Sequence, residues 1–110
     1  MDEQFIPVAD ETTLGELVER SQNEPVILFK HDPVCSISIM AYREMKQLND
    51  PIPMIDVKRA GPVSQTIARQ TGVKHESPQV IVLRNGQAVW SASHHAITAA
   101  AVERAVNEHM

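Results

Sequence analysis

A continuous run of strand-forming residues, Pro25-Val-Ile-Leu-Phe-Lys30, constrains the fold of this chain more than any other feature. A strand with one face in water alternates apolar and polar side chains. This run does not alternate, so it predicts a strand that is buried on both faces. Such a strand lies in the middle of a sheet, and the run therefore predicts an α/β fold with helices on both sides of the sheet.

Helix and strand patterns alternate on either side of this run. Before it, apolar residues share one helical face over residues 13–21, and Thr13 and Glu16 have the spacing of a capping box, which predicts a helix that begins there. After it, apolar residues recur at steps of three and four over residues 37–48, which predicts a second helix. A further strand is predicted over residues 53–57.

The C-terminal half continues with a helix, a hairpin and a closing helix. Gly61-Pro62 opens the helix, because proline is favoured at a first helical position. Asn85-Gly86 separates two apolar runs, 79–84 and 87–91, and is a strong signal for a two-residue hairpin turn. Thr98 is placed to cap the last helix.

The order of these elements predicts the topology. A βαβ half followed by a ββα half gives a central mixed four-stranded sheet flanked by helices, with an extra N-terminal helix. This architecture is thioredoxin-like. At 110 residues, the chain is expected to form a single domain over residues 1–110.

Charge and hydropathy limit the function classes. Ten Lys and Arg against fourteen Asp and Glu give a net charge of −4, and there is no basic run, so nucleic acid is not an expected partner. No apolar run is long enough to cross a membrane, and the acidic N-terminus does not resemble a secretion signal. We therefore expect a cytoplasmic protein, as a monomer or a weak dimer.

The single cysteine, Cys35, falls in the turn between the central strand and the helix predicted over residues 37–48. The free N–H groups and the dipole at a helix N-terminus favour an anion, so we expect a stabilised, nucleophilic thiolate. Open α/β sheets also bind ligands at this edge. The alternative is that Cys35 is a small buried hydrophobic residue without a chemical role.

Ser38 follows Cys35 by one helical turn and completes a C-x-x-S motif. Its hydroxyl can hydrogen-bond the Cys35 sulfur, but it cannot form a disulfide. A mixed disulfide on Cys35 would therefore have to be resolved by a thiol from outside the chain. The motif predicts a monothiol thiol-disulfide oxidoreductase.

Three other residues lie close to this motif in the predicted fold. Pro78 immediately precedes the strand over 79–84, which indicates a specific turn; because cis X–Pro bonds are uncommon, the sequence alone predicts a trans peptide bond there. His31 ends the central strand, where a cationic ring would stabilise the thiolate and a neutral ring would only pack at the sheet edge. Lys30 points to the opposite face of that strand and is expected to be a solvated charge.

Several short segments resemble the monothiol bacilliredoxin family, the YtxJ-like branch of the thioredoxin superfamily. The resemblance runs from about residue 26 to the C-terminus. The segments that carry it are Phe29-Lys-His31, Cys35-x-Ile-Ser38, His75-Glu-Ser-Pro-Gln79, Asn85-Gly86 and Trp90-x-Ala-Ser-His94-x-x-Ile-Thr98.

This resemblance implies a protein that removes bacillithiol from mixed disulfides on client proteins, through a mixed disulfide on Cys35. It also implies that the Ser77–Pro78 bond is cis and that Pro78 faces the sulfur. Bacillithiol would be the thiol co-substrate, S-thiolated proteins the partners, and no cofactor is expected to bind tightly. One departure is Ser36, which replaces the proline that follows the family's cysteine and adds a hydroxyl near the sulfur.

The predicted site therefore has two parts. Cys35, Ser38 and Pro78 are the predicted catalytic residues. The residues predicted to contact the substrate are His31, Ser36, Ser77 and His94. His94 precedes the last helix, whose N-terminal N–H groups would suit a carboxylate of the thiol; capping by Thr98 is the alternative use of that helix end.

Two other function classes remain open. C-x-x-S also resembles monothiol glutaredoxins, in which protein and small-thiol sulfurs together hold an iron–sulfur cluster, so a cluster carrier is one alternative. A non-catalytic interaction module with an inert Cys35 is the other. The five histidines and one cysteine match no zinc spacing, so no metal site is expected.

Overall fold

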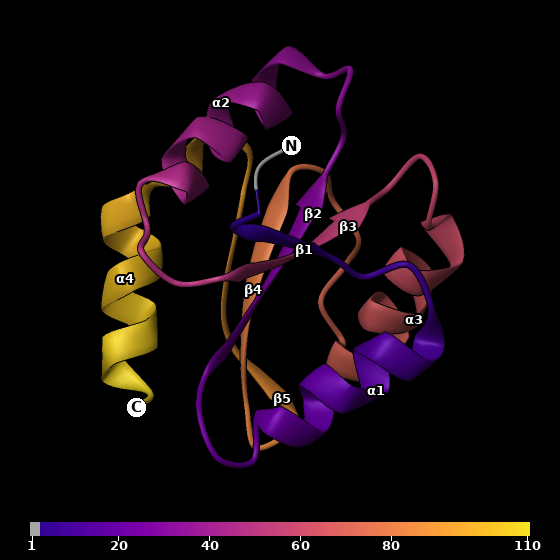
Figure 1. The fold of residues 1–110 in the computed structure, drawn as a ribbon, viewed down its shortest axis with the longest axis vertical. Helices are drawn as coiled ribbons and strands as arrows, with labels where there is room; N and C mark the ends of the chain where they lie inside the picture. Colours follow the sequence, from indigo (N-terminus) through magenta and orange to yellow (C-terminus); the bar gives the residue numbers. More distant parts are fainter. Residues whose placement is uncertain (1–2) are drawn as a thin grey trace.

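The computed structural model describes residues 3–110, which form a five-stranded mixed sheet between two layers of helices (Figure 1). In chain order the elements are β1 (Phe5–Pro7), α1 (Glu11–Arg20), β2 (Val26–His31), α2 (Ser36–Lys46), β3 (Ile52–Asp56), α3 (Gly61–Thr71), β4 (Gln79–Arg84), β5 (Gln87–Ser93), the 3₁₀ turn η1 (His94–Ala96) and α4 (Ala99–Glu108).

The strand order is β1-β3-β2-β4-β5, which puts β2 at the centre. β2 runs parallel to β3 and antiparallel to β4. All six residues of β2 are buried, which confirms that the unalternating run forms a strand covered on both faces. The mixed βαβ and ββα halves are also confirmed, with β1 as an additional edge strand.

The two faces of the sheet have separate hydrophobic cores, because alternate residues of each strand point to opposite sides. Helices α1 and α3 cover one face and α2 and α4 cover the other (Figure 1). On β2, Leu28 belongs to the first core and Phe29 to the second. Lys30 and His31 continue this alternation, so they lie on opposite faces of the sheet.

Strand β1 was not predicted from the sequence. It has only three residues, and it pairs in parallel with β3, whose partner residues lie 47 positions further along the chain (Phe5 with Ile52). Its ends are fixed by two backbone hydrogen bonds, from Ile52 N to Gln4 O at 2.8 Å and from Val8 N to Met54 O at 2.9 Å. No local pattern marks so short a strand, because its hydrogen-bond partners come from a distant segment.

The helix and turn signals were correct except at the start of α1. The predicted capping box at Thr13 is wrong: Asp10 is the N-cap and its carboxylate accepts the Thr13 N–H at 2.8 Å. Thr98 caps α4 as predicted, accepting the Ala101 N–H. In the hairpin, Asn85 and Gly86 both have positive φ, at 55° and 75°, which fits the predicted two-residue turn.

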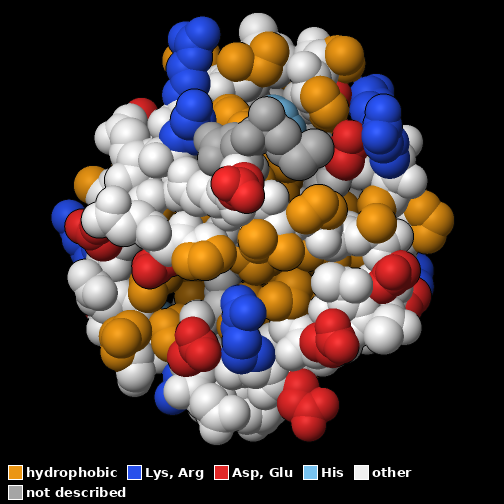
Figure 2. All heavy atoms as spheres, viewed as in Figure 1, with side chains coloured by type: hydrophobic (Ala, Val, Ile, Leu, Met, Phe, Trp, Pro, Cys, Tyr) orange, Lys and Arg blue, Asp and Glu red, His pale blue; other side chains and the backbone are white. Residues whose placement is uncertain are grey.

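Charges of both signs are interspersed over the face shown in Figure 2, with hydrophobic side chains between them and no large area of one sign. Of the helices in residues 3–110, none has both the length and the apolar character needed to span a membrane.

Candidate active site

Cys35 is the N-cap residue of α2, in the turn that follows β2. Its N–H donates to Asp32 O at 3.2 Å, and its carbonyl accepts the Ile39 N–H at 3.0 Å, so the turn is closed on both sides. The side chain is half-buried, and its sulfur makes no hydrogen bond within residues 3–110. The thiol is therefore at the surface of the molecule and not sealed in either core.

The first turn of α2 surrounds this position with free donors. The backbone N–H groups of Ser36, Ile37 and Ser38 have no acceptor within residues 3–110. Helix N-termini leave such donors unpaired and carry the positive end of the helix dipole. A negatively charged sulfur at the N-cap is next to these groups.

The Ser38 side chain is buried and bonds to two groups of the preceding strand and turn. Its Oγ accepts the Asp32 N–H at 2.8 Å and lies 2.7 Å from His31 Nδ1. The predicted hydrogen bond between Ser38 and the Cys35 sulfur is not formed within residues 3–110. Ser38 instead ties the first turn of α2 to the end of β2, which fixes the loop that carries Cys35.

His31 is a buried ring, only 7% exposed, that packs against Phe29 and Tyr42 at centroid distances of 5.3 and 5.1 Å. Burial lowers the pKa of His31, and the nearby carboxylates of Asp56 and Asp32 oppose this effect. Of the two roles left open by the sequence, the structure favours the neutral ring. The ring contacts Ser38 and so helps to hold the turn that carries Cys35; it is not an exposed cation beside the sulfur.

Pro78 lies at the same edge of the sheet as the Cys35 turn. The antiparallel register pairs Lys30 with Gln79, so Pro78, one residue earlier in β4, comes beside His31, one residue later in β2. The Ser77–Pro78 bond is cis, as the resemblance implied. Ser77 is half-buried, its backbone makes no hydrogen bond within residues 3–110, and its Oγ is also without a partner there.

Lys30 is the residue whose position differs most from the prediction. It is fully buried, not a solvated charge, and its Nζ lies 3.1 Å from His75 Nδ1. Burial lowers the pKa of Lys30 to about 8. Burial and the adjacent Lys30 together lower the pKa of His75. The signal for this burial was present in the sequence, since Lys30 continues a run that reads as buried on both faces.

His94 is brought to the site through its backbone. Its N–H donates to Pro78 O at 3.1 Å, and its φ of 55° turns the chain from β5 into η1. The ring is exposed. A hydrogen bond from Ser93 is the main cause of the lowered pKa of Glu76, and His94 also contributes, so this loop packs against the segment before Pro78.

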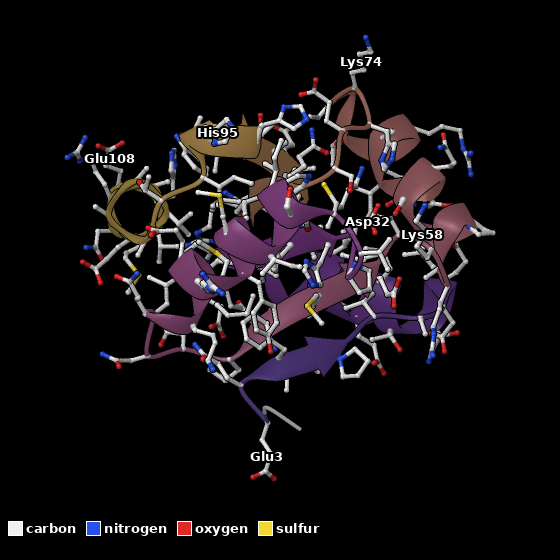
Figure 3. All side chains as sticks on the ribbon, turned by 90° about the horizontal axis from the view of Figure 1, so that it is seen from above. Glu3, Asp32, Lys58, Lys74, His95 and Glu108 are labelled. Carbon is white, nitrogen blue, oxygen red and sulfur yellow. The ribbon has the colours of Figure 1, made fainter. Side chains whose placement is uncertain are left out.

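A cavity of about 210 Å³ lies between α2 and the start of α4. Ile37 and Met40 form its α2 side, and His94 and His95 form its η1 side. Figure 3 looks onto this end of the molecule, with His95 beside the start of α4 and Asp32 next to Lys58, whose Nζ is 3.8 Å from Asp32 Oδ2.

The N-terminus of α4 is already occupied. Ala99 N donates to Glu44 Oε1 at 2.9 Å and Ala101 N donates to Thr98 Oγ1 at 3.1 Å. The helix end is therefore capped by the chain's own side chains, so the capping role of Thr98 is confirmed. These two N–H groups are therefore not available to a carboxylate of a substrate.

The other predicted residue, Ser36, is exposed at the first position of α2, next to Cys35. Over the part of the chain from residue 3 onward, no three His, Cys, Asp or Glu side chains are grouped so that they could hold a metal ion.

Comparison with solved structures identifies the fold class. A protein provisionally described as an oxidoreductase with a thioredoxin fold superposes with a TM-score of 0.85 at 28% identity, over 92% of each chain. Thioredoxin from Fasciola hepatica gives 0.74 at 11% identity, over 94% of this chain and 98% of that one. A thioredoxin mutant from Halobacterium salinarum gives 0.73 at 16% identity, over 99% and 94%. The chain has the thioredoxin fold, with one thiol where the first helix after the central strand begins.

A match to a family model assigns the chain to one family within this fold class. The family model described as monothiol bacilliredoxin BrxC matches residues 6–102, which is most of the chain. The chain therefore belongs to the monothiol bacilliredoxin BrxC family, which supports a monothiol redox function.

Proposed function

We propose that this protein is a monothiol disulfide reductase that takes a low-molecular-weight thiol, bacillithiol, off the cysteines of client proteins. The observation that carries the proposal is the position of Cys35, the chain's single thiol, half-buried at the N-cap of α2 and at the sheet edge that Pro78 shares. Membership of the bacilliredoxin family supports the choice of thiol.

The reaction has two exchange steps. In the first, the Cys35 thiolate attacks the bacillithiol sulfur of the mixed disulfide, a bond forms between these two sulfurs, and the client leaves as a thiolate that takes a proton from water. In the second, the thiolate of another bacillithiol molecule attacks the same bacillithiol sulfur. This frees Cys35 and yields bacillithiol disulfide. The second thiol comes from outside because the chain has one cysteine.

The residues around the sulfur have separate roles in this proposal. The unpaired N–H groups of α2 stabilise negative charge on the Cys35 sulfur. Ser38 is a positioning residue, because its hydrogen bonds to Asp32 and His31 hold the turn that presents the thiolate. Ser36 is exposed beside the sulfur, where its hydroxyl can contact the incoming disulfide.

Two parts of the site are available for the substrate. The unpaired backbone of Ser77 can hydrogen-bond the peptide-like part of the thiol in the manner of an added strand. The cavity between Ile37 and His94 can hold the rest of the molecule, with the exposed imidazoles of His94 and His95 near its carboxylates.

Intact-mass spectrometry tests the proposal directly. The protein is incubated with oxidised bacillithiol and with an S-bacillithiolated client, and release of client thiol is followed in parallel. We expect an adduct of one bacillithiol on Cys35 and stoichiometric release of client thiol. The Cys35→Ser variant should show neither.

The outcomes separate the alternatives. A wild-type protein that forms no adduct and releases no thiol, like the Cys35→Ser variant, would be a non-catalytic module. A panel of other small-thiol disulfides, tested in the same way, identifies the preferred thiol. A coloured dimer after anaerobic reconstitution with iron and sulfide, without thiol release, would favour a cluster carrier instead.

A further inference from the structure

Lys30 is a buried cation with no carboxylate to balance it. The side chain is 0% exposed, and within residues 3–110 it makes no ion pair with an Asp or Glu. The hydrogen bond that its Nζ makes goes to His75 Nδ1, at 3.1 Å. An ammonium group can only donate hydrogen bonds, so His75 Nδ1 is the acceptor and carries no proton in this contact.

Simple packing does not account for a lysine at this position. A methionine side chain has a similar length and would fill the same space without the cost of burying a charge. On the same face of β2 and β4, Leu28 and Ile81 are apolar, and the directly opposite Gln79 is a buried neutral amide that cannot balance a charge. We therefore assign the ammonium a role through its hydrogen bond to His75.

The segment held by this contact leads into Pro78. His75 precedes Pro78 by three residues, and a second hydrogen bond runs from Gln79 Nε2 to Lys74 O at 2.9 Å. Gln79 is directly opposite Lys30 in the sheet register. Two buried polar side chains thus attach the segment over 74–78 to neighbouring strands. Lys30 of β2 bonds to the His75 ring, and Gln79 of β4 bonds to the Lys74 carbonyl.

We propose that buried Lys30 and half-buried His75 act together as a strut, a fixed polar contact that holds the Ser77–Pro78 segment in position for the disulfide substrate. Lys30 is then a positioning residue for the reaction of Cys35, although it lies on the face of the sheet opposite to His31. The inference rests on the proposed function, because it assigns the means by which the substrate-contacting edge of that same site is fixed.

The strut should affect substrate binding and not the intrinsic reactivity of the sulfur. Small alkylating reagents such as iodoacetamide need only the thiolate, whereas a mixed disulfide must also fit against Ser77. We expect Lys30→Met to raise KM for an S-bacillithiolated client by roughly three- to tenfold, the effect of losing one hydrogen bond. The rate of Cys35 alkylation should stay at the wild-type value.

A double-mutant cycle separates the strut from general disturbance of the core. His75→Phe keeps an aromatic ring and removes the acceptor. If the two residues act through one contact, the Lys30→Met/His75→Phe double variant has the KM of either single variant. Leu28→Met, a buried change on the same strand and face, is the control and should leave KM unchanged. Effects of the two single variants that multiply in the double variant would overturn the proposal.

NMR supplies a readout that does not depend on turnover. In the wild-type protein the imidazole of His75 should carry its proton on Nε2, and Lys30→Met should shift the amide signals of Glu76, Ser77 and Gln79. The Leu28→Met spectrum should match the wild type at these amides. If Lys30→Met leaves these amide signals unchanged, Lys30 does not hold the segment and the proposal is wrong.

The two proposals fail in different ways. Wild-type protein that releases no client thiol contradicts the proposed function, and the amide shifts still decide whether Lys30 holds the segment. Wild-type protein that is active, with a Lys30→Met variant of unaltered KM, contradicts only the role of Lys30.

Discussion

Replacing Lys30 by methionine should make the protein more stable at neutral pH. Burial lowers the pKa of Lys30 from 10.5 to about 8. At about 1.36 kcal/mol for each pKa unit, keeping the ammonium charged at pH 7 lowers the free energy of unfolding by about 3 kcal/mol. The hydrogen bond to His75 returns about 1 kcal/mol. Lys30→Met should therefore raise the free energy of unfolding by about 2 kcal/mol at pH 7.

The same reasoning predicts how this gain depends on pH. Between about 8 and 10.5, the unfolded wild-type chain keeps the Lys30 proton while the folded protein has lost it. The unfolded state then binds more protons, so the stability of the wild type rises with pH in this window. The methionine variant has no such group. The difference in free energy of unfolding between Lys30→Met and the wild type should therefore shrink between pH 8 and pH 10, to about 1 kcal/mol or less.

Urea denaturation at pH 7, 8.5 and 10, followed by far-UV circular dichroism, measures these differences. Lys74→Met is the matched control, because it removes the same charge from an exposed position in the neighbouring segment. The control should stay within about 0.5 kcal/mol of the wild type at each pH. A Lys30→Met variant that is less stable than the wild type at pH 7, or whose difference does not change with pH, would refute the argument.

Three further outcomes are expected in the same unfolding assay. Ser38→Ala should lower the free energy of unfolding by about 1–3 kcal/mol, because Asp32 N–H and His31 Nδ1 lose a buried partner. The control Ser36→Ala, at an exposed position, should leave it unchanged. Equal losses in the two variants would argue against the hydrogen-bond network. Asp10→Ala should lose about 1 kcal/mol by removing the cap of α1, and no loss would mean that this cap is not formed in solution. Because the pKa of His31 is lower in the folded protein than in the unfolded chain, the unfolded chain binds the imidazole proton first as the pH drops below 6.5. The free energy of unfolding should therefore fall in this range. A His31→Phe variant whose stability falls equally steeply would contradict this prediction.

The fold and the position of the thiol could be predicted because their signals are local. The unalternating run identified the central strand, Asn85-Gly86 identified the hairpin, and Cys35 fell between a strand and a helix whose patterns are both clear. Ser38 in place of a second cysteine was enough to predict a monothiol. Strand β1 was missed because three residues carry no periodicity, and their pairing depends on β3.

The roles of the side chains around the sulfur were decided by the tertiary structure. Residue types and spacing alone determined that the chain has one thiol at a strand-to-helix turn and a proline before a later strand. They could not determine that Ser38 bonds to Asp32 and His31, or that Lys30 is buried against His75, forty-five residues away. A charge or a hydroxyl takes the partner that folding brings within reach once water is excluded, and distance along the chain does not encode that choice.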